Sequence, residues 1–184
     1  IRQLGSVIFD YAADNNGGVV LKSNGQGWPS KGSGSPFDQY TPSITDFRAM
    51  RGCPLSSKYD PINGAPGYAL VVPRATSGAT PSAVVADQPT FRLASIVNPN
   101  EFMLFIDAAE SSAPIINSVA SFESVVKPIC IKGTRDCRHD GGAHVFFADG
   151  HVALHPYSSK NPRDRYTIYA NRDRWITFDS SSSF

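Results

Sequence analysis

The first eighteen residues alternate apolar and polar positions with the period of an α-helix. Apolar side chains recur mostly at intervals of three or four residues, at Ile1, Leu4, Ile8, Tyr11 and Ala12. The pattern ends at Asn15-Asn16-Gly17-Gly18, where Asn and Gly supply the left-handed backbone that stops a helix. We therefore predict an amphipathic helix over residues 1–17 with one apolar face turned to a core.

The predicted helix has no capping residue in front of it, because the chain begins at Ile1. Helices in proteins usually begin at a Ser, Thr, Asp or Asn whose side chain satisfies the first free N–H groups. A helix without such a start is typical of the lower half of a longer one. We expect the sequence to be a fragment whose original N-terminus was removed.

The remainder of the chain carries short apolar runs bounded by turn residues, which is the pattern of β-strands. YALVV (68–72) follows the turns of PINGAPGY, and FMLFID (102–107) follows Asn98-Pro99. Residues 115–131 supply further strand pieces, 165–170 and 174–178 are typical of late strands, and 179–184 is typical of a frayed tail. One helix followed by a mostly β region with long loops predicts an α+β fold, in a single domain over residues 1–184.

Composition and charge exclude several classes of protein. Hydrophobic residues make up 41% of the chain and charged residues 18%, which is typical of a globular and not of a disordered chain. The net charge is +1 with Lys and Arg scattered, so no electrostatic footprint for nucleic acid is present. The longest apolar run, 102–106, is far short of the ~20 residues that span a bilayer.

All four histidines lie within residues 139–155, around Asp149-Gly150. Asp-Gly between two apolar runs predicts a hairpin over 143–155 with a two-residue type I′ turn, in which His144 faces His155. Strand alternation then places Val145, Phe147, Val152 and Leu154 on the core face. It places His144, Phe146, Ala148, His151, Ala153 and His155 on the solvent face. A solvated hairpin face is thus sufficient to explain the clustered histidines.

Two metal-ligand sets compete with that interpretation. Residues opposed across a hairpin lie ~5 Å apart at Cβ, so His144 and His155 can share an ion. Cys130, Cys137, His139 and His144 form the second set and are the ligand types of a structural zinc site, although no Cys-x-x-Cys knuckle is present. Neither set is strong enough for an assignment.

The chain has three cysteines, of which Cys130 and Cys137 close a short loop. Proximity favours a disulfide between these two and hence an oxidising compartment. Cys53 is then left over, and the two other pairings stay open. No nucleophile elbow, phosphate loop or His-Glu-x-x-His motif occurs, so we name no catalytic residue and expect a protein that is not an enzyme.

The stretch RHDGGAHVFFADGHV (138–152) separates His139 from Asp149-Gly150 by nine residues. It resembles the C-terminal signature of a large bacterial family of pseudopilin-like proteins. These proteins carry a prepilin-type N-terminal cleavage and methylation segment and are related to the major pseudopilin of type II secretion. Three further stretches are similar to the family: IRQLGSVIFDYAADNNG (1–17), RGCP (51–54) and FRLASIVNPNEFMLFIDAAE (91–110).

The resemblance implies a pilin-like fold, in which the second half of a long helix packs on an antiparallel sheet. It implies a non-enzymatic structural subunit, namely the soluble domain of a pseudopilin anchored in the inner membrane. The missing first half of the helix would form that anchor and join other pilin or pseudopilin subunits and the secretion machinery on the periplasmic side. Nucleic acid is not an expected partner.

The resemblance also implies roles for the signature residues. Asp149 and Gly150 specify the hairpin turn, and His139 precedes the first strand and hydrogen-bonds nearby backbone. Major pseudopilins often bind calcium through carboxylates of a late loop, for which Asp136, Asp140 and Asp149 are candidates, but no calcium-loop spacing is present and calcium is not assigned.

Two alternative functions remain open, and the leading interpretation requires no cofactor. One is a small metal-binding module for zinc or calcium. The other is an extracellular recognition module that uses the aromatic residues Trp28, Tyr40 or Tyr59 to hold a sugar or a secreted partner.

Overall fold

The computed structural model describes about half of the chain. The described residues are 1–20, 22–23, 26–27, 38–40, 43, 50, 52–55, 67–71, 74–75, 90–96, 98–109, 115–116, 126, 129, 138–156 and 177–178. Several sequence predictions fall outside them: Trp28, Tyr59, Cys130, Asp136, Cys137, the strand over 165–170 and the tail over 179–184. The prediction of a single domain over 1–184 stays a prediction.

The described elements are one α-helix, eleven strands and three short 3-10 turns. The helix is α1 (Arg2–Asp14), and the 3-10 turns are η1 (Asp38–Tyr40), η2 (Leu93–Ser95) and η3 (His139–Gly141). The strands are β1 (Gly18–Val20), β2 (Lys22–Ser23), β3 (Gln26–Gly27), β4 (Tyr68–Val71), β5 (Arg74–Ala75), β6 (Thr90–Arg92), β7 (Met103–Asp107), β8 (Ile115–Ile116), β9 (Gly142–Phe147), β10 (Val152–Pro156) and β11 (Thr177–Phe178).

Helix α1 confirms the N-terminal prediction. Four of the five apolar positions that the pattern identified are buried, namely Leu4, Ile8, Tyr11 and Ala12, whereas Ile1 is only partly buried. Gly5 and Val7 are buried beside them. The helix ends where the Asn-Gly run begins, and Asn16 and Gly17 both have positive φ, at 54° and 75°. The Gly17 N–H donates to the Ala12 carbonyl at 2.7 Å, so the left-handed backbone closes the last turn.

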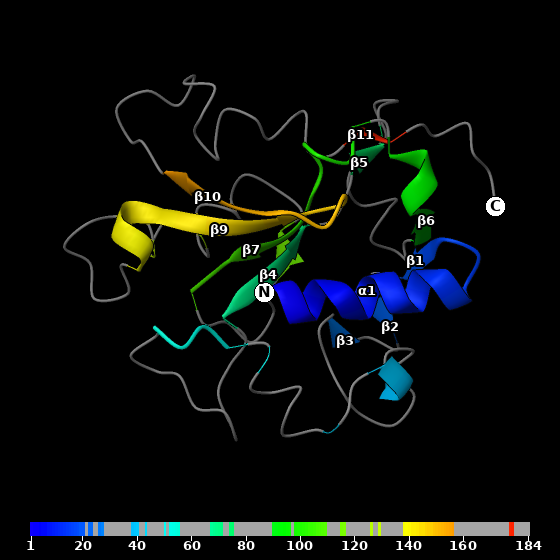
Figure 1. Ribbon diagram of the computed structural model, residues 1–184, viewed down its shortest axis with the longest axis horizontal. Helices are drawn as coiled ribbons and strands as arrows, with labels where there is room; N and C mark the ends of the chain where they lie inside the picture. The colour runs from blue at the N-terminus through cyan, green and yellow to red at the C-terminus, as the bar shows by residue number, and fades with distance from the viewer. Residues whose placement is uncertain are drawn as a thin grey trace.

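The main sheet has five strands in the order β10-β9-β7-β4-β8. The first four strands run antiparallel, and β8 pairs parallel with β4 at the edge. Strands β4 and β7 confirm the predictions over 68–72 and 102–107, and β8 and β11 fall inside the regions predicted to hold strand pieces. One helix and a mainly antiparallel sheet give the predicted α+β class, as Figure 1 shows.

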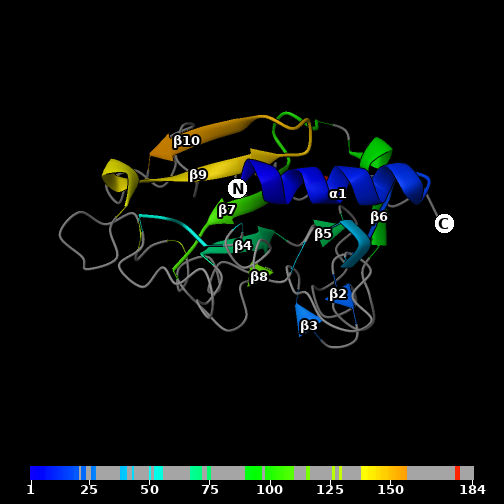
Figure 2. The same cartoon turned by 60° about the horizontal axis from the view of Figure 1, so that its bottom comes forward.

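The N-terminal part of helix α1 packs against one face of the main sheet, and the helix then extends past the sheet toward β1 and β6 (Figure 2). Phe105 and Phe146 join the apolar side of the helix in one core cluster, whereas Met103, Ile106 and Val145 belong to a second cluster. All five residues of β7 are buried, because apolar layers cover both faces of this strand. This explains why its sequence is a continuous apolar run without alternation.

The closest approach between helix and sheet depends on Gly5. A Cβ atom at Gly5 would lie 2.0–2.4 Å from three atoms of the Phe146 ring. Phe146 is itself held between Phe9 of the helix, at a ring-centroid distance of 5.7 Å, and Phe105 of β7, at 6.2 Å. The Phe146 ring therefore cannot move to make room for a side chain at position 5, and only glycine allows this packing.

The β9–β10 hairpin differs from its prediction by one residue of register. Phe146 pairs with Val152 and His144 pairs with Leu154. The Gly150 N–H donates to the Phe147 carbonyl at 3.0 Å, and the Phe147 N–H donates to the His151 carbonyl at 3.0 Å. Only Gly150 in this turn has positive φ, at 92°. The loop is therefore three residues long, a type I turn closed by a left-handed glycine, and the predicted type I′ turn is wrong.

The register change overturns the predicted solvent face. Because the side-chain period is two, a shift of one residue moves a whole strand to the other face. His144 now shares a face with Leu154, whereas His155 pairs with Ala143 on the opposite face. Phe146 packs in the core, and Leu154, predicted to be in the core, is 50% exposed. The prediction of three histidines on one solvent face was therefore wrong. His144 and His155, left open as a candidate metal pair, lie on opposite faces of the hairpin.

Among the described residues, no helix combines the length and the apolar character needed to cross a membrane.

Substitution of Gly5 by Ala tests the contact between helix and sheet. We expect Gly5→Ala to lower the free energy of unfolding by about 2 kcal/mol, because overpacking exceeds the ~1 kcal/mol that Ala gains over Gly in a helix. Chemical denaturation measures the change. In a Phe146→Leu background the same substitution should be nearly neutral, since the obstructing ring is gone. A stabilising Gly5→Ala would contradict the packing described for this site.

Candidate functional site

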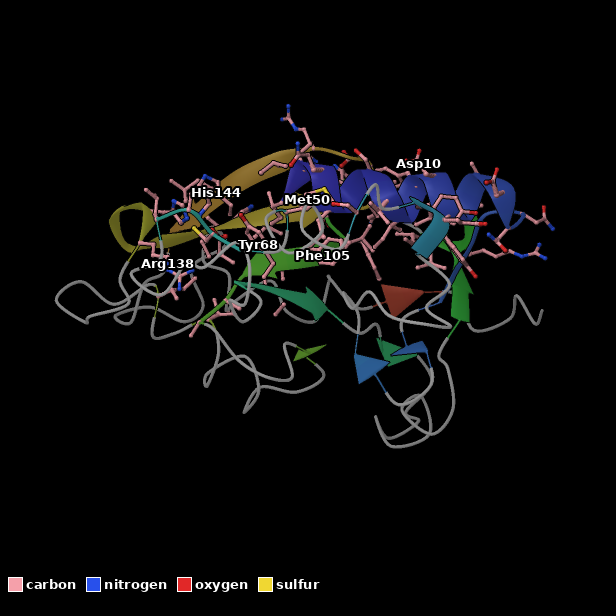
Figure 3. The ribbon with its side chains drawn as sticks, turned by 90° about the horizontal axis from the view of Figure 1, so that it is seen from below. Asp10, Met50, Tyr68, Phe105, Arg138 and His144 are labelled. Atoms are coloured by element: carbon pink, nitrogen blue, oxygen red, sulfur yellow. The ribbon has the colours of Figure 1, made fainter. Side chains whose placement is uncertain are left out.

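Asp107 is a buried carboxylate at the end of the central strand β7. It follows Phe105 by two residues, so it shares the helix-covered face of the sheet. Its neighbour Ile106 pairs with Val145 of β9, which brings His144 directly beside it. Figure 3 shows His144 and Arg138 beyond the N-terminal end of α1. The side chain of Asp107 is only 1% exposed, so its polar atoms depend on protein partners.

One oxygen of Asp107, Oδ2, lies within 3.1 Å of three nitrogen atoms. The backbone N–H of His144 donates to Oδ2 at 2.7 Å, and Nδ1 of the same histidine lies 3.1 Å from it. Nε2 of His139 lies 3.1 Å from the same oxygen. The two rings meet edge to face, with centroids 4.3 Å apart. The carboxylate thus gathers both histidines into one cluster with Asp107.

These partners determine the charge state of Asp107. Burial alone would raise the pKa of its carboxyl, but hydrogen bonds from His139 and His144 outweigh burial and lower the pKa to about 2. The hydrogen bond to Asp107 raises the pKa of His144 in turn, against the smaller opposing effect of burial. The cluster therefore contains a stable buried anion at neutral pH.

His139 reaches Asp107 from a left-handed backbone position. Its φ is 52°, a conformation that few residues other than glycine adopt, although histidine is enriched there. The preceding residue, Arg138, is buried, and its N–H donates to the Ile129 carbonyl at 2.9 Å. We predicted a hydrogen bond from His139 to nearby backbone. Among the described residues its ring instead contacts the side chain of Asp107 on another strand.

Cys53 completes the cluster from a segment far away in sequence. It is a buried, free thiol, and its Sγ lies 3.5 Å from Nε2 of His139. Gly67, just before β4, allows this approach, because a Cβ atom there would lie 2.7 Å from the Cys53 backbone nitrogen. Cys53 Sγ, Asp107 Oδ2 and His139 Nε2 form a group of metal-ligating atoms within 4.8 Å of one another.

The arrangement does not fit nucleophilic catalysis by a Cys-His-Asp relay. Such a relay needs the nucleophile on one ring nitrogen of the histidine and the carboxylate on the other. Here the thiol and the carboxylate both approach the same atom, Nε2 of His139. Donor atoms that converge on one point are the arrangement of a metal centre.

The other two histidines belong to the hairpin itself. Nδ1 of His151 lies 2.6 Å from Oδ1 of Asp149, and the His151 ring stacks on Phe147 with centroids 4.2 Å apart. His155 also packs on Phe147, at 5.5 Å. Burial would raise the pKa of Asp149, but hydrogen bonds from His151 outweigh it and lower that pKa. Burial lowers the pKa of His155. Asp149 and Gly150 thus lie in the hairpin turn, which has three residues and is not the type I′ turn that these two residues were expected to specify.

The structure brings together only part of each predicted ligand set. His139 and His144 meet at Asp107, whereas His155 lies on the other face of the hairpin, and Cys130 and Cys137 lie outside the described residues. Asp149, a calcium candidate, is bound to His151 instead.

Sequence reasoning missed Asp107 and Cys53 as site residues. The available signals were a carboxylate that ends an otherwise apolar strand and a cysteine left over from the predicted disulfide. Tyr40, the recognition candidate within the described part of the chain, packs edge to face on Tyr11 and donates a hydrogen bond to Asp14 at 3.0 Å.

Comparison of the chain with protein-family models, with curated proteins and with solved structures finds no match in any of the three.

Two Asp-His pairs involve the β9–β10 hairpin, and they differ chiefly in burial. Asp107 of β7 pairs with His144, and Asp149 pairs with His151. The difference in burial is testable. In chelator-treated protein we expect Asp107→Ala to lower the free energy of unfolding by about 3 kcal/mol, because it leaves buried donors without an acceptor. Asp149→Ala, at the exposed pair, should lower it by less than about 1 kcal/mol. Denaturant titration compares the two variants. Equal losses would show that burial of Asp107 does not matter for stability.

Proposed function

We propose that this chain is the globular domain of a pseudopilin-like subunit, a non-enzymatic building block of a filament. The observation that carries the proposal is the position of α1. The helix lies on an antiparallel sheet, attached through the contact between Gly5 and Phe146. Its opposite side is polar and exposed, with Arg2, Gln3, Ser6, Asp10 and Asp14. A helix supported along one side and accessible along the other suits assembly by helix packing.

The signature residues support the same proposal through what they contact. His139 is tied to Asp107 of the central strand, and Asp149 is tied to His151 at the hairpin tip. Gly150 supplies the left-handed position that closes the turn, and it lies so near the helix that a Cβ atom there would be 3.3 Å from the Phe9 ring. These residues hold the hairpin against the sheet and the helix, which is a scaffold role.

The mechanism that follows is mechanical. The helix would continue upstream of Ile1 as an anchor in the inner membrane, and neighbouring subunits would pack their helices into a short filament. The globular domains would then face the periplasm, where a growing filament contacts the secretion machinery. His139, Asp149 and Gly150 would keep the sheet and the helix together while force is transmitted along the filament.

Processing of the product of the complete gene tests this proposal. We expect the protein to be shortened by a prepilin peptidase, and to stay membrane-bound and full-length in cells that lack this peptidase. Mass spectrometry of the mature N-terminus measures the cleavage. Removal of a conventional signal peptide, with release of the domain, would refute the proposal.

Crosslinking in intact membranes tests the assembly surface independently of processing. With a bifunctional thiol reagent, Ser6→Cys on the exposed side of α1 should give a ladder of multimers, because neighbouring helices pack side by side. The matched control is Asn100→Cys, at an exposed turn that is not part of the helix. Equal ladders from both positions, or none from either, would contradict assembly through α1.

A further inference from the structure

The filament role leaves the convergence of three metal-ligating atoms at the end of the sheet without a use. Cys53 comes from the Cys-Pro turn, Asp107 from the end of β7, and His139 from η3. We propose that these three residues bind one zinc ion. The site differs from both ligand sets that the sequence suggested, and it holds whether or not the domain assembles into a filament.

The distances agree with tetrahedral zinc. Typical zinc bonds of about 2.3 Å to sulfur and about 2.1 Å to nitrogen and oxygen place ligand atoms roughly 3.6 Å apart for S···N and roughly 3.4 Å apart for N···O. The observed separations are 3.5 Å from Cys53 Sγ to His139 Nε2 and 3.1 Å from Nε2 to Asp107 Oδ2. These two separations lie within a few tenths of an ångström of the tetrahedral values, and all three ligand atoms lie within 4.8 Å of one another.

The donor types select zinc over harder cations. Calcium and magnesium prefer sets made of oxygen ligands, whereas a thiolate and an imidazole beside one carboxylate suit zinc. Charge agrees with this choice, since a thiolate, a carboxylate and a neutral imidazole carry two negative charges that Zn²⁺ balances. Balance matters because Cys53 and Asp107 are buried, where an uncompensated charge is strongly unfavourable.

The backbone around the site also favours a fixed ligand position. His139 is held at a φ of 52°, a conformation that costs of order 1 kcal/mol for a residue other than glycine. Gly67 leaves space for the Cys53 backbone. The backbone of His139 and the space at Gly67 thus bring the side chains of His139 and Cys53 together, although the two residues are distant in sequence. Zinc there would fasten the Cys-Pro turn and the signature histidine to the central strand.

His144 acts as a positioning residue for Asp107. Its N–H and Nδ1 both reach Oδ2, at 2.7 Å and 3.1 Å. Partners of this kind orient a ligating carboxylate and raise metal affinity. Three protein ligands and one water then complete the tetrahedron.

Metal analysis of the full chain tests the site. Protein purified without chelator should contain one equivalent of zinc. After chelator treatment, titration with Co²⁺ should give tetrahedral d–d bands and a thiolate-to-cobalt charge-transfer band that saturate at one equivalent. Absence of zinc beyond a trace together with absence of these bands, or stoichiometric copper or iron in place of zinc, would overturn the proposal.

Substitution of the proposed ligands tests which side chains bind the zinc ion. Cys53→Ala should abolish the charge-transfer band, and Asp107→Asn and His139→Ala should each weaken zinc binding at least about 100-fold. The matched controls are Cys130→Ser/Cys137→Ser and His155→Ala, which should keep one zinc and the same cobalt spectrum. Loss of zinc in the Cys130/Cys137 variant, with retention in Cys53→Ala, would overturn the assignment. Circular dichroism is used to check that each variant is folded. The cobalt spectrum of the wild-type protein tests the proposal without any variant.

The positioning role of His144 has its own readout. His144→Ala should weaken zinc binding about 10- to 100-fold while the charge-transfer band stays, because Cys53 is still a ligand. His151→Ala, at the exposed Asp149–His151 pair, should change neither quantity. Unchanged zinc affinity in His144→Ala would refute the positioning role.

Discussion

The carboxylate of Asp107 is the constraint on which the arrangement around the sheet depends. A charge this deeply buried is stable only with donors on its oxygens. Without a metal they come from two places: the first half of β9 through His144 and the 3-10 turn before it through His139. Zinc bound at Nε2 of His139 would replace the second of these partners. If these donors moved away, an unpaired anion would remain in the core. The hairpin and His139 are therefore fixed relative to β7.

The helix depends on the same strands through apolar packing. Phe146, two residues after His144 on β9, lies against Gly5 of the helix and against Phe105 of β7. Strand β9 thus provides both the hydrogen bond to Asp107 and the apolar contact that holds the helix against the sheet. A shift of β9 by one residue would exchange its faces and would break both interactions together.

The sequence was sufficient for the elements whose pattern is local. The helix followed from its apolar period and its Asn-Gly end, and β4 and β7 followed from apolar runs between turns. The hairpin register was not predictable from alternation, because β9 is covered on both faces and its pattern does not separate a core side from a solvent side. Asp-Gly also suits a three-residue turn with a left-handed glycine.

The site was predictable only in part, because some of its residues are close in sequence and others are brought together only by the fold. His139 and His144 stood out because they lie close together in a short stretch. Asp107 and Cys53 are joined to them only by the fold, and nothing in the local sequence of RGCP or FMLFID indicates a shared partner. Cys53 meets His139 because Gly67 lets the Cys-Pro turn pack against the start of β4. Such a contact between distant segments is visible only once the strand order is known.

The most direct measurement of the central claim, that Asp107 organises a centre with Cys53 and His139, is anomalous diffraction from crystals of the zinc-loaded chain. Data collected above and below the zinc absorption edge locate the ion without assumptions about its ligands. The account predicts a single peak about 2.3 Å from Cys53 Sγ and about 2.1 Å from His139 Nε2 and Asp107 Oδ2. A peak at Cys130 and Cys137, or no peak at the Asp107 cluster, would contradict it.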